Sequence, residues 1–408
     1  FIDNLLKELK ALDLGFDVGG LILTVLAYAD DLVILSDSEE KLQKLLDCLT
    51  EWCSKWRLSV NNAKSGVIHF RKSRAPKTQH KFKLAGNDVE VLSEYKYLGV
   101  VLDEHLTYKS ATRILANSGG RALGGIISKF KSFKDIGYNT YTKLFDNCVA
   151  PILEYGAGVW APGQKFPDID NIMLRACRYY LGVHRYAPIP GVMGDMGWIP
   201  NSVRRQVISC RLWNRLITMD DSRLTKKLFM LDLEAGGKFT NFIGSICDDY
   251  NIDDCFSQRN TLDLKFIQGK AMESYVDDWR QNVLSKPKLR TYKHFKTSYG
   301  VEQYVLSHLP KSRRSLIAQL RLSILPIRIE TGRFVCEKQE ERLCKLCDGT
   351  NVEDENHVLL ECPCYETIRT EFLGKIDQSI FANLDNFNKQ KFLYEHHPYV
   401  TGNMLSKI

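Results

Sequence analysis

The sequence predicts an α+β protein in which antiparallel hairpins and a helix come first and a mainly helical region with a small cysteine-rich module follows. This prediction rests on two patterns of apolar residues and on one cluster of cysteines with a histidine. Short apolar runs separated by turn residues fill residues 1–105, which is typical of hairpins. Apolar side chains take helical spacing from about Lys109 onward. Cysteines and a histidine gather between residues 344 and 364, which indicates a metal site.

The first predicted segment, residues 1–105, combines two helices with short strands. Apolar residues at helical spacing open the chain. Leu21–Ala29 and Leu32–Leu35 have the composition of buried strands, with an acidic pair between them. Ser36–Ser38 can cap the next helix, whose leucines and tryptophans line one face. Further strands are predicted at Leu58–Val60, Val67–Phe70, Phe82–Leu84, Val89–Leu92 and Tyr97–Leu102.

From residue 106 the pattern is helical, and four further segments are predicted. They are a helical connection at 106–233, a basic helical region at 234–335, a cysteine-rich module at 336–370 and a tail at 371–408. Pro151–Trp160 is apolar and rich in turn residues, and the chain after Asn383 shows no clear element.

The composition is that of a folded protein that is neither secreted nor membrane-spanning. The formal charge is +7, from 56 basic and 49 acidic residues, which permits nucleic-acid binding without establishing it. No run approaches the roughly 18 apolar residues of a membrane span, and we find no secretory signal. Most of the 12 cysteines are scattered, which favours reduced thiols inside the cell. The chain starts with Phe1 rather than Met, so we expect a processed chain or a piece of a longer reading frame.

An acidic pair, Asp30 and Asp31, lies between two apolar strands. Two carboxylates on a tight hairpin are costly to bury without a counter-ion, and a divalent metal is their natural partner. Two-metal phosphoryl transfer needs such bridging carboxylates, with Mg²⁺ as the usual ion. A solvated Asp-Asp turn is the structural alternative.

The residues around this pair resemble the palm of reverse transcriptases of non-LTR retrotransposons, of the jockey-like kind. The resemblance lies in Tyr28-Ala29-Asp30-Asp31 with the strand after it, in Phe1-Ile2-Asp3-Asn4-Leu5, in Leu58–Ser65 and in Tyr97-Leu98-Gly99-Val100. It continues in order through Pro151–Trp160, Leu320-Arg321-Leu322, Glu330–Phe334 and Asp354–His357. The fold implied is a partial palm over residues 1–105, followed by a thumb and helical connection over residues 106–233.

The resemblance implies an RNA-directed DNA polymerase that acts in target-primed reverse transcription. Its partners would be template RNA, target or primer DNA and deoxynucleoside triphosphates, in the nucleus and in cytoplasmic ribonucleoprotein. Asp30 and Asp31 would hold Mg²⁺, Lys64 would assist the triphosphate, and Tyr28 and Ala29 would adjoin the substrate. Tyr97-Leu98-Gly99 would support the primer end.

The family's first catalytic aspartate would lie upstream of Phe1. We therefore expect the two-metal site to be incomplete here and the 408-residue chain to be inactive by itself. The runner-up interpretation is a non-catalytic nucleic-acid-binding remnant or a domesticated element protein. A structural zinc protein with an accidental acidic pair is a third interpretation.

The cysteine-rich module has ligands at zinc spacing. Cys344 and Cys347 flank two residues, so both thiolates can reach one ion. His357 and Cys362 lie about one helical turn apart. Four such ligands suit a closed, structural Zn²⁺ site. Cys364 competes with Cys362 for the fourth position. Free thiols beside an unrelated histidine are the alternative.

Basic residues mark candidate contacts to nucleic acid. Lysine and arginine bind phosphates, and interleaved aromatics can stack on unpaired bases. A solvated surface explains each group equally well. The candidates are Arg71, Lys72, Lys293, Arg313 and Arg314.

Overall fold

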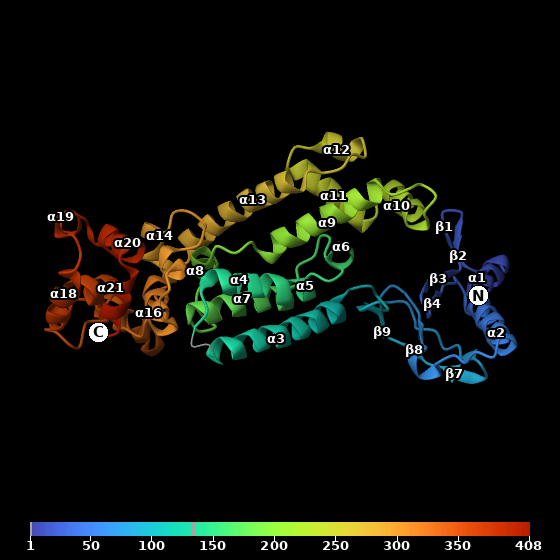
Figure 1. Cartoon of the computed structure of the whole chain (residues 1–408), viewed down its shortest axis with the longest axis horizontal. Coiled ribbons are helices and arrows are strands. Elements are labelled where there is room, and N and C mark those ends of the chain that lie inside the picture. The colour runs from blue at the N-terminus through green and yellow to red at the C-terminus, as the bar shows by residue number, and fades with distance from the viewer. Residues whose placement is uncertain (1, 133–134) are drawn as a thin grey trace. The chain divides into compact units, whose positions relative to one another are not determined.

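The computed structural model describes residues 2–132 and 135–408, and these form two compact units. The first unit contains the residues up to Arg113 together with Gly158–Gly163 and Cys210–Leu262. The second contains Ile114–Ala157, Gln164–Ser209 and Asp263–Ile408. Short hairpins in the first unit and helices in both confirm the α+β class (Figure 1).

All of the strands in the described part of the chain are short and precede residue 104. They are β1 (Phe16–Val18), β2 (Leu21–Leu23), β3 (Val25–Tyr28), β4 (Asp31–Ile34), β5 (Val67–Ile68), β6 (Phe82–Leu84), β7 (Asn87–Val89), β8 (Val91–Leu92), β9 (Glu94–Tyr97) and β10 (Val100–Asp103).

The helices run from the N-terminal region to the end of the chain. Those up to residue 217 are α1 (Ile2–Ala11), α2 (Glu39–Lys55), α3 (Lys109–Ser132), α4 (Tyr138–Cys148), α5 (Ala150–Leu153), α6 (Ala157–Trp160), α7 (Pro167–Leu181), α8 (Ile189–Met196) and α9 (Asn201–Ile217). The rest are α10 (Leu224–Ala235), α11 (Lys238–Asp249), α12 (Asp253–Ser257), α13 (Leu264–Ser285), α14 (Tyr292–Phe295), α15 (Gln303–Leu306), α16 (Lys311–Arg321), α17 (Arg328–Thr331), α18 (Glu366–Leu373), α19 (Gln378–Phe381), α20 (Asn386–His396) and α21 (Pro398–Leu405).

The hairpins differ from the prediction in several places. The predicted strand Val89–Leu92 is divided, so that Val89 ends β7 and Val91–Leu92 forms β8. The predicted strand Leu21–Ala29 is divided at the buried Thr24, so that β2 pairs with β1 and β3 pairs with β4. Leu58–Val60 forms no strand. The predicted strand Tyr97–Leu102 is a hairpin of β9 and β10, because Leu98 and Gly99 adopt positive φ and reverse the chain. Among these pairs, β5 and β8 run parallel and the other pairs antiparallel.

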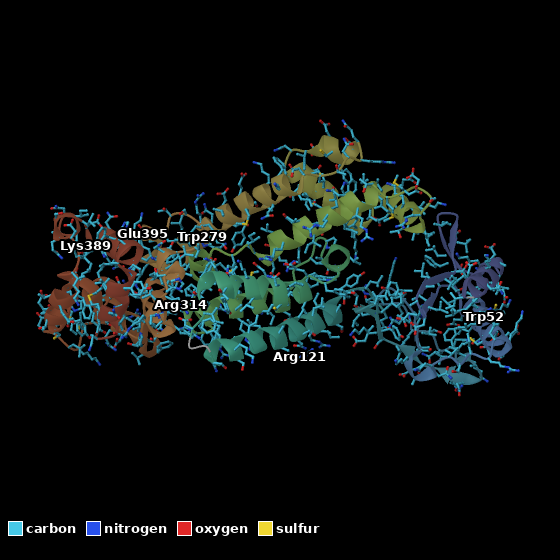
Figure 2. All side chains as sticks on the ribbon, in the orientation of Figure 1. Trp52, Arg121, Trp279, Arg314, Lys389 and Glu395 are labelled. Atoms are coloured by element: carbon cyan, nitrogen blue, oxygen red, sulfur yellow. The ribbon has the colours of Figure 1, made fainter. Side chains whose placement is uncertain are left out.

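Helix α2 organises the core around these hairpins. Ser38 caps it as predicted, and the hydroxyl accepts a hydrogen bond of 3.2 Å from the Lys41 backbone N–H. Leu45, Leu49 and Trp52 are buried on one face of α2 and pack with α1 and β6. Figure 2 labels Trp52. Apolar side chains at helical spacing form one face of α2, and burial of that face stabilises the packing of the hairpins against the helix. Phe1, the first residue of the segment Phe1-Ile2-Asp3-Asn4-Leu5 that resembles the family, lies outside the described residues.

The second unit has an aromatic core between α4 and α7. The Tyr141 ring stacks on Tyr180 at 5.0 Å between centroids and meets Phe130 edge-on at 5.6 Å. Burial raises the pKa of the Tyr180 phenol to about 12, so it stays protonated. Its neighbour Arg314 lies with the guanidinium carbon 4.0 Å from the ring centroid.

The tail beyond Asn383 is helical, contrary to the prediction. Asp385 caps α20, because its carboxylate accepts a hydrogen bond of 2.9 Å from the Asn388 backbone N–H. Helix α20 packs against α14, α15 and α21, so no single apolar stripe marks it in the sequence. Helix α21 packs against α16 and α18. Within the described residues, no helix is both long and apolar enough to cross a membrane.

Candidate catalytic tip and metal centre

The acidic pair lies at the end of the β3–β4 hairpin. Tyr28 pairs with Asp31 across the ladder, so Ala29 and Asp30 form the two-residue turn. Ala29 has φ of 54°, a left-handed conformation that costs an L-residue on the order of 1–2 kcal/mol. Asp30 and Asp31 are exposed, and Tyr28 is 64% exposed. The hairpin therefore holds two carboxylates at an exposed position.

Strand β9 contacts the segment of Lys64 and carries Tyr97. The Tyr95 hydroxyl donates a hydrogen bond of 2.5 Å to the Lys64 backbone carbonyl. Partial burial raises the pKa of the Tyr97 phenol, and the negative charge of Asp31 raises it further. Strand β9 thus contacts the segment of Lys64, about thirty residues earlier in the sequence.

Lys64 and the turn of the β9–β10 hairpin are open to solvent. Lys64 ends a short 3₁₀ turn, Asn62–Lys64, and its side chain is exposed. Leu98 is 41% exposed and has φ of 47°. Gly99 has φ of 86°, which glycine adopts without strain. Of the predicted primer-supporting residues, Leu98 and Gly99 are therefore exposed and Tyr97 is half-buried.

Asp30 and Asp31 are chemically suited to a hard divalent cation. Mg²⁺ prefers carboxylate oxygens together with substrate phosphates and water. Neither carboxylate takes part in an ion pair with the part of the chain that the structure describes. Their charge is therefore available to a metal ion.

The cysteine-rich module brings its four predicted ligands together. The donor atoms of Cys344, Cys347, His357 and Cys362 all lie within 4.8 Å of one another. Cys347 Sγ lies 3.6 Å from His357 Nε2. Thiolate and imidazole donors at these separations fit a tetrahedral Zn²⁺ site, with metal–ligand distances of roughly 2.0–2.3 Å.

Backbone contacts hold this cluster from both sides. The Cys344 N–H donates to the Asn351 carbonyl at 2.9 Å, which closes the loop after the first two cysteines. A π-helical turn, His357–Glu361, follows, and the Cys362 N–H donates to the His357 carbonyl at 2.7 Å. Cys344, His357 and Cys362 are buried. Cys364 is exposed, and its thiol donates to the Leu346 carbonyl at 2.8 Å. The geometry favours Cys362 over Cys364 as the fourth ligand.

The predicted nucleic-acid contacts do not all lie on the surface. Lys72 and Lys293 are exposed. Arg71 is half-buried, pairs with Glu104 at 3.1 Å and donates to the Ala75 carbonyl. Arg313 packs its Cβ close to Gly402 of α21.

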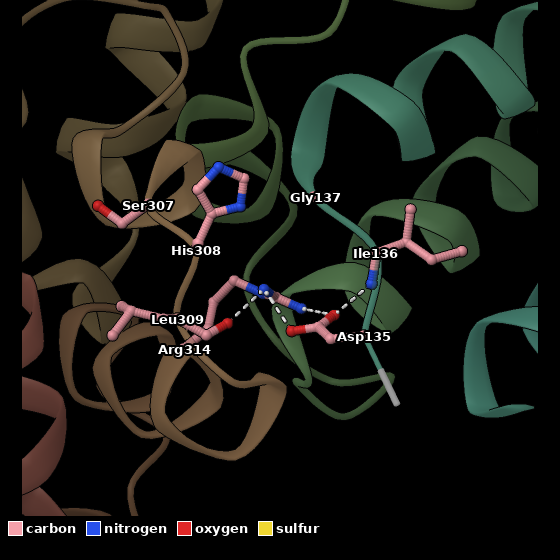
Figure 3. A pocket seen from close by; sticks show the side chains of 7 residues that line it. All are labelled: Asp135, Ile136, Gly137, Ser307, His308, Leu309 and Arg314. Atoms are coloured by element: carbon pink, nitrogen blue, oxygen red, sulfur yellow. Dashed lines mark hydrogen bonds and ion pairs between the residues drawn. The ribbon is translucent and has the colours of Figure 1, made fainter. Parts of the chain in front are cut away.

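Of the predicted nucleic-acid contacts, Arg314 differs most clearly from the prediction. Its side chain is 1% exposed and forms an ion pair of 3.1 Å with Asp135. Figure 3 shows the two beside a small cavity of about 100 Å³, which Ile136 and His308 also line. Its Nε donates to the Tyr180 carbonyl at 3.0 Å. Arg314 is therefore a buried structural residue and cannot reach a phosphate in this conformation.

Tyr95 is the residue that the sequence interpretation missed. It lies on the same face of β9 as Tyr97, because residues two apart on a strand share a face. Two tyrosines at that spacing next to a turn are the signal that could have identified it.

Comparisons with known proteins found one family model and several relatives. A family model described as reverse transcriptase (RNA-dependent DNA polymerase) matches residues 1–102. The RNA-directed DNA polymerase from mobile element jockey of Drosophila funebris is 28% identical over 142 residues, which cover 33% of this chain and 15% of that protein. A probable RNA-directed DNA polymerase from transposon BS of Drosophila melanogaster is 26% identical over 168 residues, 38% of this chain and 18% of that protein.

A third relative is shorter. A putative uncharacterized transposon-derived protein of Caenorhabditis elegans is 27% identical over 143 residues, which cover 35% of this chain and 50% of that protein. The matched part therefore spans less than a fifth of the two polymerases and half of the third relative.

Proposed function

We propose that this chain, which belongs to the reverse transcriptases of non-LTR retrotransposons, supplies the acidic tip for metal-dependent nucleotidyl transfer in target-primed reverse transcription. The observation that carries the proposal is the β3–β4 hairpin with Asp30 and Asp31 exposed at its end. Residues 1–105 form part of the palm in this proposal. The other segment boundaries stay predictions.

The reaction joins a primer 3′-oxygen to the α-phosphorus of a deoxynucleoside triphosphate, and pyrophosphate leaves. Mg²⁺ held by Asp30 and Asp31 would neutralise the charge that develops on the phosphate oxygens. Lys64, anchored through its carbonyl by Tyr95, would orient the triphosphate or protonate the leaving pyrophosphate. Tyr97, Leu98 and Gly99 would support the primer end, and Tyr28 and Ala29 would adjoin the nucleotide.

The proposed partners follow from this reaction. They are template RNA, primer or target DNA and deoxynucleoside triphosphates, which implies work in the nucleus and in cytoplasmic ribonucleoprotein. We further propose that Cys344, Cys347, His357 and Cys362 hold a structural Zn²⁺. Lys72 and Lys293 remain candidate phosphate contacts, because both are exposed.

Primer extension tests the proposal. The family resemblance assigns the first catalytic aspartate to a segment before Phe1, so the 408 residues alone are expected to extend no primer. A longer polypeptide, in which the corresponding part of a jockey-type relative precedes residue 1, is expected to extend a primer on an RNA template with Mg²⁺. Asp30→Asn and Asp31→Asn should each lower its rate by about a thousandfold or more, since a catalytic metal contributes several kcal/mol.

Asp88→Asn is the matched control, because Asp88 is an exposed aspartate in another hairpin of the same unit. Extension by the tip variants at the rate of this control would refute the catalytic role of the pair. Primer extension by the 408-residue chain alone would refute the expectation that its two-metal site is incomplete. RNA binding without extension by the longer polypeptide would favour a non-catalytic nucleic-acid-binding protein.

A further inference from the structure

Arg369 is a buried arginine beside the cysteine-rich module, and its ion pair within the described residues is with an exposed acid. It belongs to α18, and its side chain is 5% exposed. The acid, Glu366, lies 2.7 Å from Nη2 but is 69% exposed. Water screens an ion pair with so exposed a partner, so Glu366 offsets little of the cost of burying the guanidinium.

The guanidinium of Arg369 also contacts a residue of the metal cluster. Its Nη2 donates one hydrogen bond to Glu366 and another, of 2.5 Å, to the Cys362 carbonyl. Its Nη1 is buried and has no hydrogen-bond partner in the part of the chain that the structure describes. A buried donor without a partner destabilises the fold, because its hydrogen bonds to water are lost. The contacts of Arg369 within the protein therefore do not explain why a cation is buried here.

The backbone of Cys362 is held by three hydrogen bonds. Its N–H donates to the His357 carbonyl at 2.7 Å, and its carbonyl accepts from the Tyr365 N–H at 3.1 Å. The bond from Arg369 is the third, and it is the one that comes from a side chain of α18. Cys362 is completely buried, so the position of its thiol depends on how these bonds fix the backbone.

The metal cluster has a charge that a neighbouring cation would balance. Its donor set is three cysteines and one histidine, and a metal ligand must be a thiolate or a neutral imidazole. Three thiolates exceed the two positive charges of Zn²⁺, so the loaded set carries one excess negative charge. Cys344, His357 and Cys362 are buried, and a buried anion needs a cation or hydrogen-bond donors beside it. The Arg369 guanidinium, bonded to Cys362, provides both.

We propose that Arg369 is a positioning residue of this metal centre, which fixes the backbone of Cys362 and balances the excess negative charge of the three thiolates. Arg369 acts through Cys362 and is not itself a ligand. This inference rests on the proposed zinc site and adds to it a residue outside the four ligands. Loss of a group that supports a metal ligand typically lowers metal affinity by about 10-fold to 100-fold.

Zinc affinity of the 408-residue chain, measured by competition with a chelating dye, tests the inference. Arg369→Met keeps an unbranched side chain but removes the charge and the donors, and it should weaken zinc binding by about 10-fold to 100-fold. Arg369→Lys keeps the charge, so its affinity should lie between those of the wild type and Arg369→Met. Circular dichroism of the metal-free variants checks that their helices are retained.

Two control variants separate a role at the metal centre from the loss of an ion pair. Glu366→Gln removes the exposed partner of Arg369 and should keep the zinc affinity of the wild type. Arg205→Gln removes another buried arginine of the second unit, which pairs at 2.8 Å with the 40% exposed Asp170. It should also keep the zinc affinity, because Arg205 bonds to Asp170 and not to a residue of the metal cluster.

Cobalt substitution adds a measurement of the geometry of the centre. Co²⁺ held tetrahedrally by thiolates absorbs visible light, and its bands move when the arrangement of the ligands changes. At saturating Co²⁺ the wild type and Glu366→Gln should show the same bands. Arg369→Met should shift them, because α18 no longer holds the backbone of Cys362.

Two outcomes would overturn the inference while leaving the zinc site in place. One is that Arg369→Met binds zinc as tightly as the wild type and shows the same cobalt bands. The other is that Glu366→Gln loses as much zinc affinity as Arg369→Met, which would assign the effect to the ion pair. A wild-type chain that binds no zinc would instead refute the proposed zinc site and this inference with it, so the two failures are distinguishable.

Discussion

Replacing Asp195 with alanine is expected to lower the free energy of unfolding of the second unit by about 3–5 kcal/mol, because it leaves a buried cation without its partner. Asp195 and Arg321 are 0% and 1% exposed, and Arg321 Nη2 lies 2.9 Å from the carboxylate. The Tyr304 hydroxyl donates to the same carboxylate at 2.6 Å. Glu302, at 2.8 Å, would be the remaining counter-ion of Arg321.

The loss of unfolding free energy expected for Asp195→Ala depends on pH. Burial opposes ionisation of Asp195, but Arg321 outweighs it and holds the pKa of that carboxyl below its ordinary value of 3.8. A depressed pKa stabilises the folded state above the unfolded value, and the stabilisation is lost as pH falls through the lower folded value. The difference between wild type and Asp195→Ala should therefore be full at neutral pH and shrink in acid.

Urea unfolding followed by circular dichroism measures the effect, and hydrogen exchange of α8 and α16 locates it. Lys270→Ala is the control, because it removes an exposed ion pair with Glu273 and should cost at most about 1 kcal/mol. A loss for Asp195→Ala no larger than that of the control would show that the buried pair contributes little.

Replacing Cys362 with serine is expected to abolish zinc binding, whereas replacing Cys364 with serine should leave it intact. Cys362 lies within the four-ligand cluster, and Cys364 is exposed and bonded to a carbonyl. Structural zinc contributes about 10 kcal/mol or more to the folding of small zinc modules. Its loss should therefore unfold residues 336–370 locally, which mass-detected hydrogen exchange would reveal.

Zinc affinity should also fall as pH falls. Burial raises the pKa of the Cys362 thiol, so binding of the ion must displace its proton. Metal content by atomic emission, measured for the wild type and both serine variants, checks the assignment. Zinc retained by Cys362→Ser and lost by Cys364→Ser would reverse it.

Local patterns placed the acidic pair on a hairpin and the four candidate metal ligands close to one another, as the structure has them. Asp30 and Asp31 fall at a hairpin end because apolar strand residues flank them on both sides. Cys344, Cys347 and His357 converge because short spacing limits where their side chains can go. The function of these residues is still a proposal, but their positions agree with the prediction.

The sequence pattern could not predict which charged side chains are buried. Lys311, Arg313 and Arg314 look alike in a basic run, yet the orientation of α16 buries Arg314 together with Ile317, Ala318 and Arg321. These four share one helix face, and the acids that neutralise the two arginines come from distant segments. The hydrogen bond from Tyr95 of β9 to the Lys64 carbonyl was likewise set by tertiary packing.

Iron-mediated hydroxyl-radical cleavage tests the central claim most directly. Fe²⁺ bound at a magnesium site reduces added hydrogen peroxide to hydroxyl radicals, which cut the backbone close to the metal ligands, and added ascorbate regenerates the Fe²⁺. The measurement needs no nucleic-acid substrate. The account predicts cleavage of the 408-residue chain near Asp30 and Asp31. Excess Mg²⁺ should suppress the cuts, and the Asp30→Asn/Asp31→Asn double variant should remove them. Uncut protein, or an unchanged pattern in the double variant, would contradict a metal site at the hairpin tip.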